Sequence, residues 1–272
     1  MLMASQLLMA KSPEEAISAK TAQAAFLAGG TEVNRLGSSV DAETLISLKK
    51  CSGLDGIESD AGYVTIGCMC TFQQLIESDK VPAYIREAAH FMASRTKRNM
   101  ATIGGNIASM RSDSYMIPAL IAAGAVLELD CSGGSCRIGI EEYLDKAAEY
   151  AGCLILSVTV PEKIKLMSKR YSNTAQSHAV LTMSAAVCED GIVMAAALKN
   201  SGIYRLMDFE KALKADPEMS DDDIISWFRN WDAIKVEAVM FGGEDYKRYL
   251  MGVTACDFRA GLASGSGKEV ES

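Results

Sequence analysis

The sequence of 272 residues lacks several patterns that would assign a function directly. Its eight cysteines include no C-x-x-C pair, which excludes the usual zinc and ferredoxin spacings. Neither a P-loop nor a G-x-G-x-x-G fingerprint is present, so the common nucleotide-binding motifs are disfavoured. No apolar run approaches the roughly 20 residues that a membrane-spanning helix needs.

The cysteines are expected to be reduced structural thiols. Cys68 and Cys70 are the closest pair, and no second pair completes a metal site beside them. The first ten residues have no basic region of the kind that opens a signal peptide. These features favour a cytoplasmic protein, since thiols stay reduced in that compartment.

The charge balance is acidic. The formal net charge is −8, which argues against a nucleic-acid partner or an anionic membrane surface. The one dense basic run is Arg95-Thr96-Lys97-Arg98; it could approach a cofactor or a partner, and solvated charge is the simpler interpretation. The two histidines, His90 and His178, have no carboxylate or cysteine at ligand spacing, so we expect structural roles and no metal site.

What the chain does have is two similar glycine loops. Each follows an apolar run and pairs two glycines with a small polar residue, in Phe26–Val33 and again in Met100–Ala108. Glycine permits positive φ and lets a ligand lie against the main chain, and successive N–H groups in such a turn form an anion-binding concavity. Two such loops predict a long, phosphate-containing cofactor, held mainly by main-chain N–H groups and by the hydroxyls of Thr31 and Thr102.

The surrounding pattern is mixed α/β. Capping boxes predict helices from Ser12 to about Gln23 and from Thr71 onward. The other predicted helices cover 86–93, 118–123, 140–144, 221–230 and 246–262, and the predicted strands cover 24–28, 44–48, 63–67, 125–129 and 153–160, with a turn over 131–136. Apolar runs on either side of Glu189-Asp190-Gly191 predict a hairpin of strands 181–187 and 192–198.

These elements suggest a division of the chain into three parts and a tail. We expect subdomains at 1–54 and 55–164, a C-terminal domain at 165–263 and a flexible end at 264–272. The glycine- and aspartate-rich stretch from Gly53 to Gly62 serves as the first boundary.

The two loops carry a family resemblance. Ala28-Gly29-Gly30-Thr31-Glu32 and Ala101-Thr102-Ile103-Gly104-Gly105-Asn106-Ile107-Ala108 resemble the FAD-binding loops of the flavoprotein subunit of molybdenum hydroxylases, the group of the xanthine, aerobic carbon monoxide and nicotinate dehydrogenases. The Ser-Pro-Glu-Glu-Ala opening and the strands ending at Gly67 and Pro161 extend the resemblance over most of the chain.

The resemblance implies a vanillyl-alcohol-oxidase-type FAD-binding fold. Two N-terminal α/β subdomains would hold an extended FAD, followed by a C-terminal domain of antiparallel sheet plus helices. A separate molybdopterin-binding large subunit would hydroxylate the substrate. A [2Fe–2S] small subunit would relay electrons to this flavin and on to NAD or another acceptor. Because the chemistry belongs to the cofactor, no catalytic acid or base is nominated. The implied cofactor-binding residues are Ala28, Gly29, Gly30, Thr31, Glu32, Val33, Thr102, Ile103, Gly104, Gly105, Asn106, Asp113, Leu156 and Lys169.

The sequence departs from the family pattern just after the second loop. Counting from Asn106 puts Tyr115 where relatives carry an aspartate for the sugar hydroxyls of FAD, while Asp113 lies two residues early. Where some relatives stack an aromatic ring on the flavin, this chain offers Met92 beside Phe91. Lys169 falls near the expected adenine end, and an exposed lysine at a strand end explains it equally well.

Three functions remain open on these grounds. The first is an FAD-binding electron-transfer subunit of a molybdenum hydroxylase. The second is a flavin-free structural or assembly subunit that kept the fold while the Tyr115 departure weakened the site. The third is a stand-alone flavin oxidase, which the short C-terminal domain disfavours.

Overall fold

A computed structural model describes residues 4–35, 40–240 and 242–263, in two compact units. The first unit comprises Met1–Met110 and Gly124–Lys163, and the second comprises Arg111–Ala123 and Ile164–Ser272. The expected flexible end, 264–272, lies outside the described residues.

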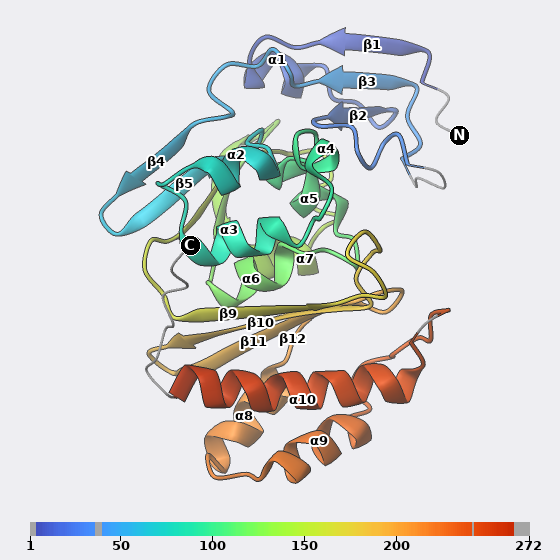
Figure 1. Ribbon diagram of the computed structural model, residues 1–272. Coiled ribbons are helices and arrows are strands. Elements are labelled where there is room, and N and C mark those ends of the chain that lie inside the picture. Colours follow the sequence, from blue (N-terminus) through green and yellow to red (C-terminus); the bar gives the residue numbers. More distant parts are fainter. Residues whose placement is uncertain (1–3, 36–39, 241, 264–272) are drawn as a thin grey trace. The chain divides into compact units, whose positions relative to one another are not determined.

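The first unit opens with a small parallel sheet in the order β1-β3-β2, beside helix α1 (Figure 1). Its elements are β1 (Gln6–Met9), α1 (Pro13–Ser18), β2 (Ala24–Leu27) and β3 (Thr44–Ser47). The predicted extent of the first helix is wrong, because α1 ends at Ser18 and not near Gln23. The chain must turn back within a few residues to bring β2 alongside β3, and this pairing outweighs helix propensity.

The second sheet of this unit is antiparallel, in the order β4-β5-β8-β6-β7. Its strands are β4 (Ile57–Asp60), β5 (Tyr63–Gly67), β6 (Val126–Cys131), β7 (Gly134–Gly139) and β8 (Leu154–Pro161). The helices of the unit after α1 are α2 (Phe72–Glu77), α3 (Ala83–His90), α4 (Arg95–Arg98), α5 (Ile103–Ser109) and α7 (Ile140–Asp145). The predicted capping box at Thr71 and Gln74 is confirmed.

Two hairpins in this sheet were not predicted. Ala61 and Gly62 both have positive φ and join β4 to β5 through a two-residue turn, inside the stretch that the sequence reading treats as a boundary. The predicted turn over 131–136 is too long, since Cys131 pairs directly with Gly134 and β7 begins there. Short polar strands such as β4 have no apolar pattern in the sequence, so only their pairing with a neighbouring strand identifies them.

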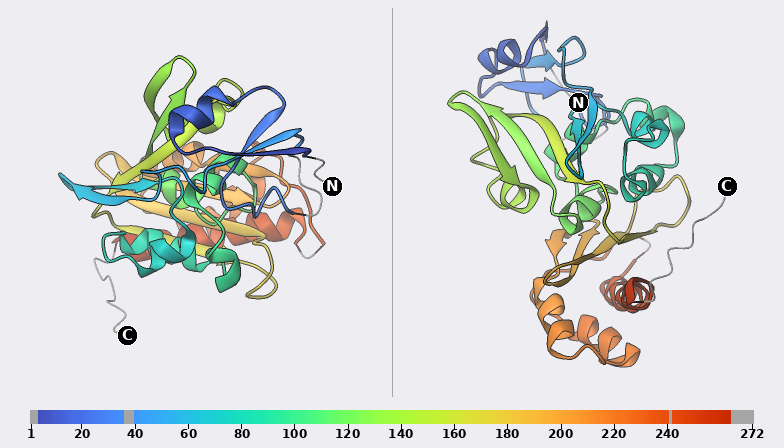
Figure 2. Two further views of the ribbon diagram at one scale, coloured as in Figure 1. Left: turned by 90° about the horizontal axis from the view of Figure 1, so that it is seen from above. Right: turned by 90° about the vertical axis from the view of Figure 1, so that its left-hand side faces the viewer.

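The second unit is a four-stranded antiparallel sheet in the order β12-β11-β10-β9, with helices on both faces (Figure 2). Its strands are β9 (Leu166–Tyr171), β10 (Leu181–Cys188), β11 (Gly191–Leu198) and β12 (Gly202–Arg205). Its helices are α6 (Ile117–Ala122), α8 (Met207–Ala215), α9 (Asp221–Asn230) and α10 (Glu244–Ala263). The predicted hairpin is confirmed, with Cys188 opposite Gly191.

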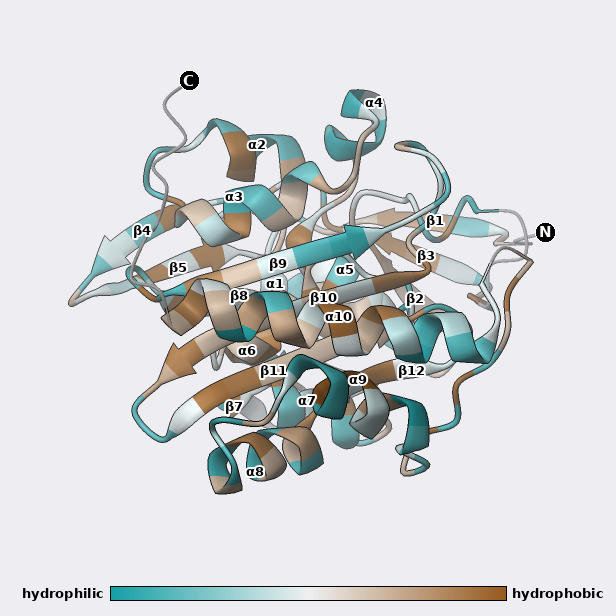
Figure 3. Cartoon of the chain, turned by 60° about the horizontal axis from the view of Figure 1, so that its bottom comes forward, coloured by the Kyte–Doolittle hydropathy of each residue, from teal (hydrophilic) through white to brown (hydrophobic). Residues whose placement is uncertain are grey.

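The core of the second unit lies between the sheet and helices α8 to α10. Leu181, Met183 and Ala185 from β10 pack there with Phe209 of α8 and Phe258 of α10. Figure 3 shows apolar residues along β10 and β11, and hydrophilic ones at the end of β9. Helix α6 packs on the sheet as well, so β10 is buried almost throughout.

The expected domain boundaries stay a prediction. The first unit takes in most of both expected N-terminal subdomains, and one segment of the middle subdomain lies in the second unit. Residues 111–123, expected in the middle subdomain, belong to the second unit because α6 packs on its sheet. All six residues of α6 are buried, and Gly124 ends the helix with a φ of +63°.

The expectation that all cysteines are reduced is wrong. Cys131 and Cys153 form a disulfide, and six cysteines are free. Asp130 of β6 lies opposite Leu154 of β8, which brings the two flanking cysteines side by side. Only strand register produces this proximity, because the cysteines are 22 residues apart in sequence. No helix in the described part of the chain is both long and apolar enough to cross a bilayer.

The disulfide predicts a thiol count. Protein unfolded without a reductant should show six reactive thiols and, after reduction, all eight. The double variant Cys131→Ser/Cys153→Ser should unfold with a free energy lower by about 3 kcal/mol, because the cross-link restricts the unfolded chain. Colorimetric thiol titration and denaturant unfolding measure both effects. Eight thiols in unreduced protein would contradict the bond.

Candidate functional site

The first glycine loop follows β2 directly and turns sharply. Gly30 has a φ of +76°, the conformation that favours glycine, and its carbonyl accepts the N–H of Asn34 at 3.0 Å. Glu32 pairs with Arg35 at 2.8 Å, while Val33 is buried against Ala42 and Leu45. The contacts of Glu32 and Val33 thus anchor the end of the loop that is farther from β2. The turn at Gly30 lies close to the end of that strand.

The second glycine segment is the start of a helix, not the loop that the sequence reading expects. Thr102 is the N-cap of α5, and its hydroxyl accepts the N–H of Gly105 at 3.1 Å. Neither Gly104 nor Gly105 has positive φ. The sequence signal for this was present, because threonine before a short apolar stretch is a helix start, and the two glycines obscured it.

The N–H groups at the start of α5 are already used within the first unit. Ile103 donates to the carbonyl of Cys70 at 3.0 Å, and Gly104 donates to the carbonyl of Cys68 at 2.9 Å. A Cβ on Gly104 would stand 2.5 Å from the Cβ of Cys68. Glycine is therefore required here for close packing of the helix on the segment after β5, and not for exposing main-chain donors.

The two glycine segments lie against each other. A Cβ on Gly29 would stand 1.6 Å from the carbonyl oxygen of Met100, so any side chain at Gly29 would force the segments apart. A Cβ on Gly105 would lie 3.7 Å from that of Ala28. The sequence predicted two loops for one ligand, and the structure brings them into direct contact.

Free hydrogen-bond donors remain on the first loop. The N–H groups of Gly29, Gly30 and Thr31 donate to no acceptor in the described part of the chain. Gly29, the first of the three, lines a cavity of about 280 Å³ together with Met100 and Thr102. Three successive donors at a glycine corner with a cavity alongside suit the phosphate oxygens of an extended cofactor.

Leu156 links the large sheet to this arrangement. It is the extra residue of a β-bulge, because Ile155 and Ser157 pair with the adjacent residues Leu129 and Glu128 of β6. Its carbonyl accepts the N–H of Cys68 at 2.9 Å, and Cys68 in turn accepts from Gly104. The bulge thus sets the position of α5 through two hydrogen bonds.

Asp113 belongs to the second unit and is already bound on two sides. Arg111 donates to both of its carboxylate oxygens, at 2.8 and 2.6 Å, and Nδ1 of His178 lies 3.1 Å away. Burial alone would raise the pKa of this carboxyl, but the hydrogen bonds from His178 and Arg111 outweigh it and hold the pKa well below the usual range. His178 therefore has the structural role expected of it.

Tyr115 and Lys169 also have partners in the second unit. Tyr115 is 9% exposed. The guanidinium carbon of Arg170 lies over the Tyr115 ring, 5.2 Å from the ring centroid. Lys169 forms an ion pair with Asp257 of α10. This pair accounts for Lys169 without a cofactor, and its expected role near the adenine stays a prediction.

The basic run around α4 has a structural role in two of its three cations. Arg98 donates to the side chain of Gln73 at 2.9 Å and to the carbonyl of Met92 at 2.8 Å. Arg95 pairs with Glu77 at 3.1 Å. Among the described residues, no group of three or more histidine, cysteine, aspartate or glutamate side chains is arranged to hold a metal ion.

Sequence reasoning missed the residues that hold the loops together. Met100 contributes a carbonyl and Cys68 contributes both backbone groups, so neither side chain carries the information. The only sequence signal for them is indirect: a glycine on the opposite segment where no side chain fits.

The geometry agrees with comparisons to known proteins. Residues 3–163 match the family model of the FAD binding domain in molybdopterin dehydrogenase. The chain is 30% identical to the uncharacterized protein YgfM of Escherichia coli (strain K12), over 88% of this chain and 87% of that one. It is 32% identical to the carbon monoxide dehydrogenase medium chain of Afipia carboxidovorans, over 54% and 56%.

A solved structure shares the fold. Carbon monoxide dehydrogenase from Oligotropha carboxidovorans superposes with a TM-score of 0.81 at 21% identity, covering 94% of this chain and 96% of that one. The chain belongs to the family of FAD-binding domains of molybdopterin dehydrogenases. The expected fold class, the FAD cofactor and the assignment to oxidoreductase flavoproteins are thereby confirmed.

Gly29 is the position where one added carbon tests the site. Gly29→Ala should lower the free energy of unfolding by about 3 kcal/mol and abolish FAD retention, because the new methyl group meets the Met100 carbonyl. Gly152→Ala is the matched control, since nothing lies within 4 Å of its Cβ position. Visible flavin absorbance per chain and thermal unfolding measure the two effects, and full flavin content in Gly29→Ala would contradict the packing.

The lowered pKa of Asp113 predicts a pH dependence. A depressed folded-state pKa means that the ion pair stabilises the fold above the ordinary carboxyl pKa of about 3.9 and loses that effect as the pH falls. Asp113→Asn should therefore cost about 3 kcal/mol at neutral pH, and its difference from the wild type should shrink below about pH 4. Denaturant unfolding across this range measures it.

Asp257→Asn is the control for that series. It breaks the exposed pair with Lys169 and should cost less than about 1 kcal/mol. A pH-independent difference between wild type and Asp113→Asn would show that the carboxylate charge contributes nothing.

Proposed function

We propose that this chain is the FAD-carrying electron-transfer subunit of a multi-subunit molybdenum hydroxylase. In this proposal it takes electrons from a [2Fe–2S] small subunit and passes them to NAD or another acceptor, while a molybdopterin-binding large subunit hydroxylates the substrate. FAD, when bound, supplies the exchange between one-electron and two-electron carriers. The residues of this chain bind and orient that cofactor, and none of them acts as an acid or base.

The observation that carries the proposal is the set of free donors at the first loop. The N–H groups of Gly29, Gly30 and Thr31 would hold the pyrophosphate oxygens. The hydroxyl of Thr102 accepts from Gly105 and still has its own proton to donate to a phosphate. Gly104, Gly105 and Ile103 would contribute by fixing the start of α5 against this corner.

The flavin-free alternative draws on a different observation. Asp113 is the carboxylate nearest in sequence to position 115, where relatives carry an aspartate for the sugar hydroxyls of FAD. Asp113 is held by Arg111 and His178, and Tyr115 is buried under Arg170. Within the second unit, these contacts leave neither the Asp113 nor the Tyr115 side chain as a free partner for a sugar hydroxyl. A subunit that kept the phosphate corner but lost these contacts would bind FAD weakly and serve assembly.

Flavin titration distinguishes the two. Purified full-length chain incubated with FAD should retain about one flavin per chain through gel filtration, and Gly29→Ala should retain none. Anaerobic NADH should bleach the bound flavin if NAD is the acceptor; a flavin that responds only to a reduced [2Fe–2S] subunit would remove NAD from the proposal. A folded chain that stays colourless yet assembles with its partner subunits would establish the flavin-free alternative.

A further inference from the structure

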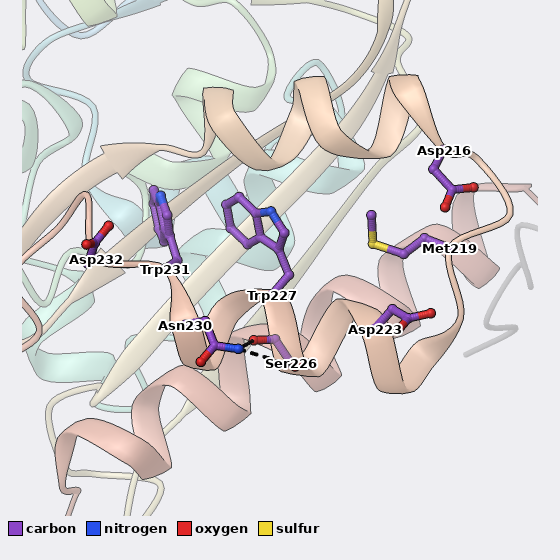
Figure 4. A pocket seen from close by; sticks show the side chains of 8 residues that line it. All are labelled: Asp216, Met219, Asp223, Ser226, Trp227, Asn230, Trp231 and Asp232. Atoms are coloured by element: carbon purple, nitrogen blue, oxygen red, sulfur yellow. Dashed lines mark hydrogen bonds between the residues drawn. The ribbon is translucent and has the colours of Figure 1, made fainter.

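An open groove runs along α9 in the second unit, with both tryptophans of the protein in its wall. The cavity measures about 540 Å³, and its lining extends from Asp216, just after α8, to Asp232, just after α9 (Figure 4). Trp227 lies in the middle and Trp231 towards one end. Nothing in the flavin proposal uses this region.

The two indole rings form one continuous wall. Their centroids are 5.3 Å apart with an angle of 31° between the planes, and Trp227 also packs on Phe209 and Phe228. Rings this close leave no room for a cation between them, so they do not form an aromatic cage. A planar guanidinium or the stem of a lysine can instead lie across the outer face of such a wall.

The carboxylates around the wall lack cationic partners. Asp216, Asp223 and Asp232 are exposed, and none of them forms an ion pair with a described residue, whereas the neighbouring Asp221 pairs with Arg259. The cation of α9 itself, Arg229, lies over the ring of Tyr249. The groove therefore presents unneutralised negative charge at both ends of an aromatic surface.

We propose that this groove binds a basic, extended segment of a partner protein. The length of the ten-residue helix α9 is about 15 Å, which about five extended residues span. Arginine or lysine side chains at the ends of such a segment reach the carboxylates at each end, and one between them covers the tryptophans. A single small cation would use only one end, so the polypeptide is the occupant that the whole groove fits.

The chain carries its own probe for this proposal. Trp227 and Trp231 are its only tryptophans, so intrinsic tryptophan fluorescence reports on the groove alone. Titration of the full-length chain with a blocked peptide of alternating arginine and glycine should change that fluorescence saturably. The same peptide with glutamine in place of arginine should have no effect, and added salt should weaken the arginine peptide.

Matched charge variants locate the binding. Asp216→Asn/Asp232→Asn should weaken the arginine peptide about tenfold, since each exposed ion pair contributes modestly. Glu218→Gln/Asp222→Asn removes the same charge from exposed residues of the same region that do not line the groove, and should change the affinity less than about threefold.

Three results would overturn the proposal. The first is an absence of saturable change in fluorescence. The second is an equal loss of affinity in both double variants, which means attraction to net charge only. The third is full competition by tetramethylammonium at the same affinity as the peptide, which assigns the groove to a small cation. None of these results bears on flavin binding.

Discussion

The contact between Gly29 and the carbonyl of Met100 is the constraint on which the rest of the first unit depends. It is possible only because position 29 has no Cβ. The contact brings the end of β2 against the segment that leads into α5, so a parallel sheet and an antiparallel sheet present their ends at one corner. Close packing of this kind tolerates almost no added volume.

The two glycine segments have different roles, although their sequences are similar. In α5, the first N–H groups bond to Cys70, Cys68 and the Thr102 hydroxyl, which makes this segment a rigid support. In the first loop, three N–H groups have no acceptor among the described residues, and the first of them, at Gly29, belongs to a residue that lines a cavity. A donor that is held in place without a partner is pre-organised for an anion, and the support keeps it there.

In the second unit, the charged side chains are of two kinds. Asp113 is enclosed by Arg111 and His178, so a buried charge is neutralised and hydrogen-bonded. Around α9, carboxylates stay exposed beside two tryptophans. The ion pairs explain Asp113 as a structural element. The groove carboxylates form no ion pair with a described residue, which makes them candidates for recognition.

The sequence by itself determined the family resemblance of the two glycine segments, the β10–β11 hairpin, most helices and the cofactor class, because each depends on residues close together in the chain. It did not determine the strands β4 and β7, the disulfide between Cys131 and Cys153, or the placement of α6 in the second unit. Nor did it distinguish the N–H groups near Gly29, which have no acceptor among the described residues, from the satisfied ones in α5. These features depend on strand register and on which distant backbone groups meet, and only the tertiary structure decides that.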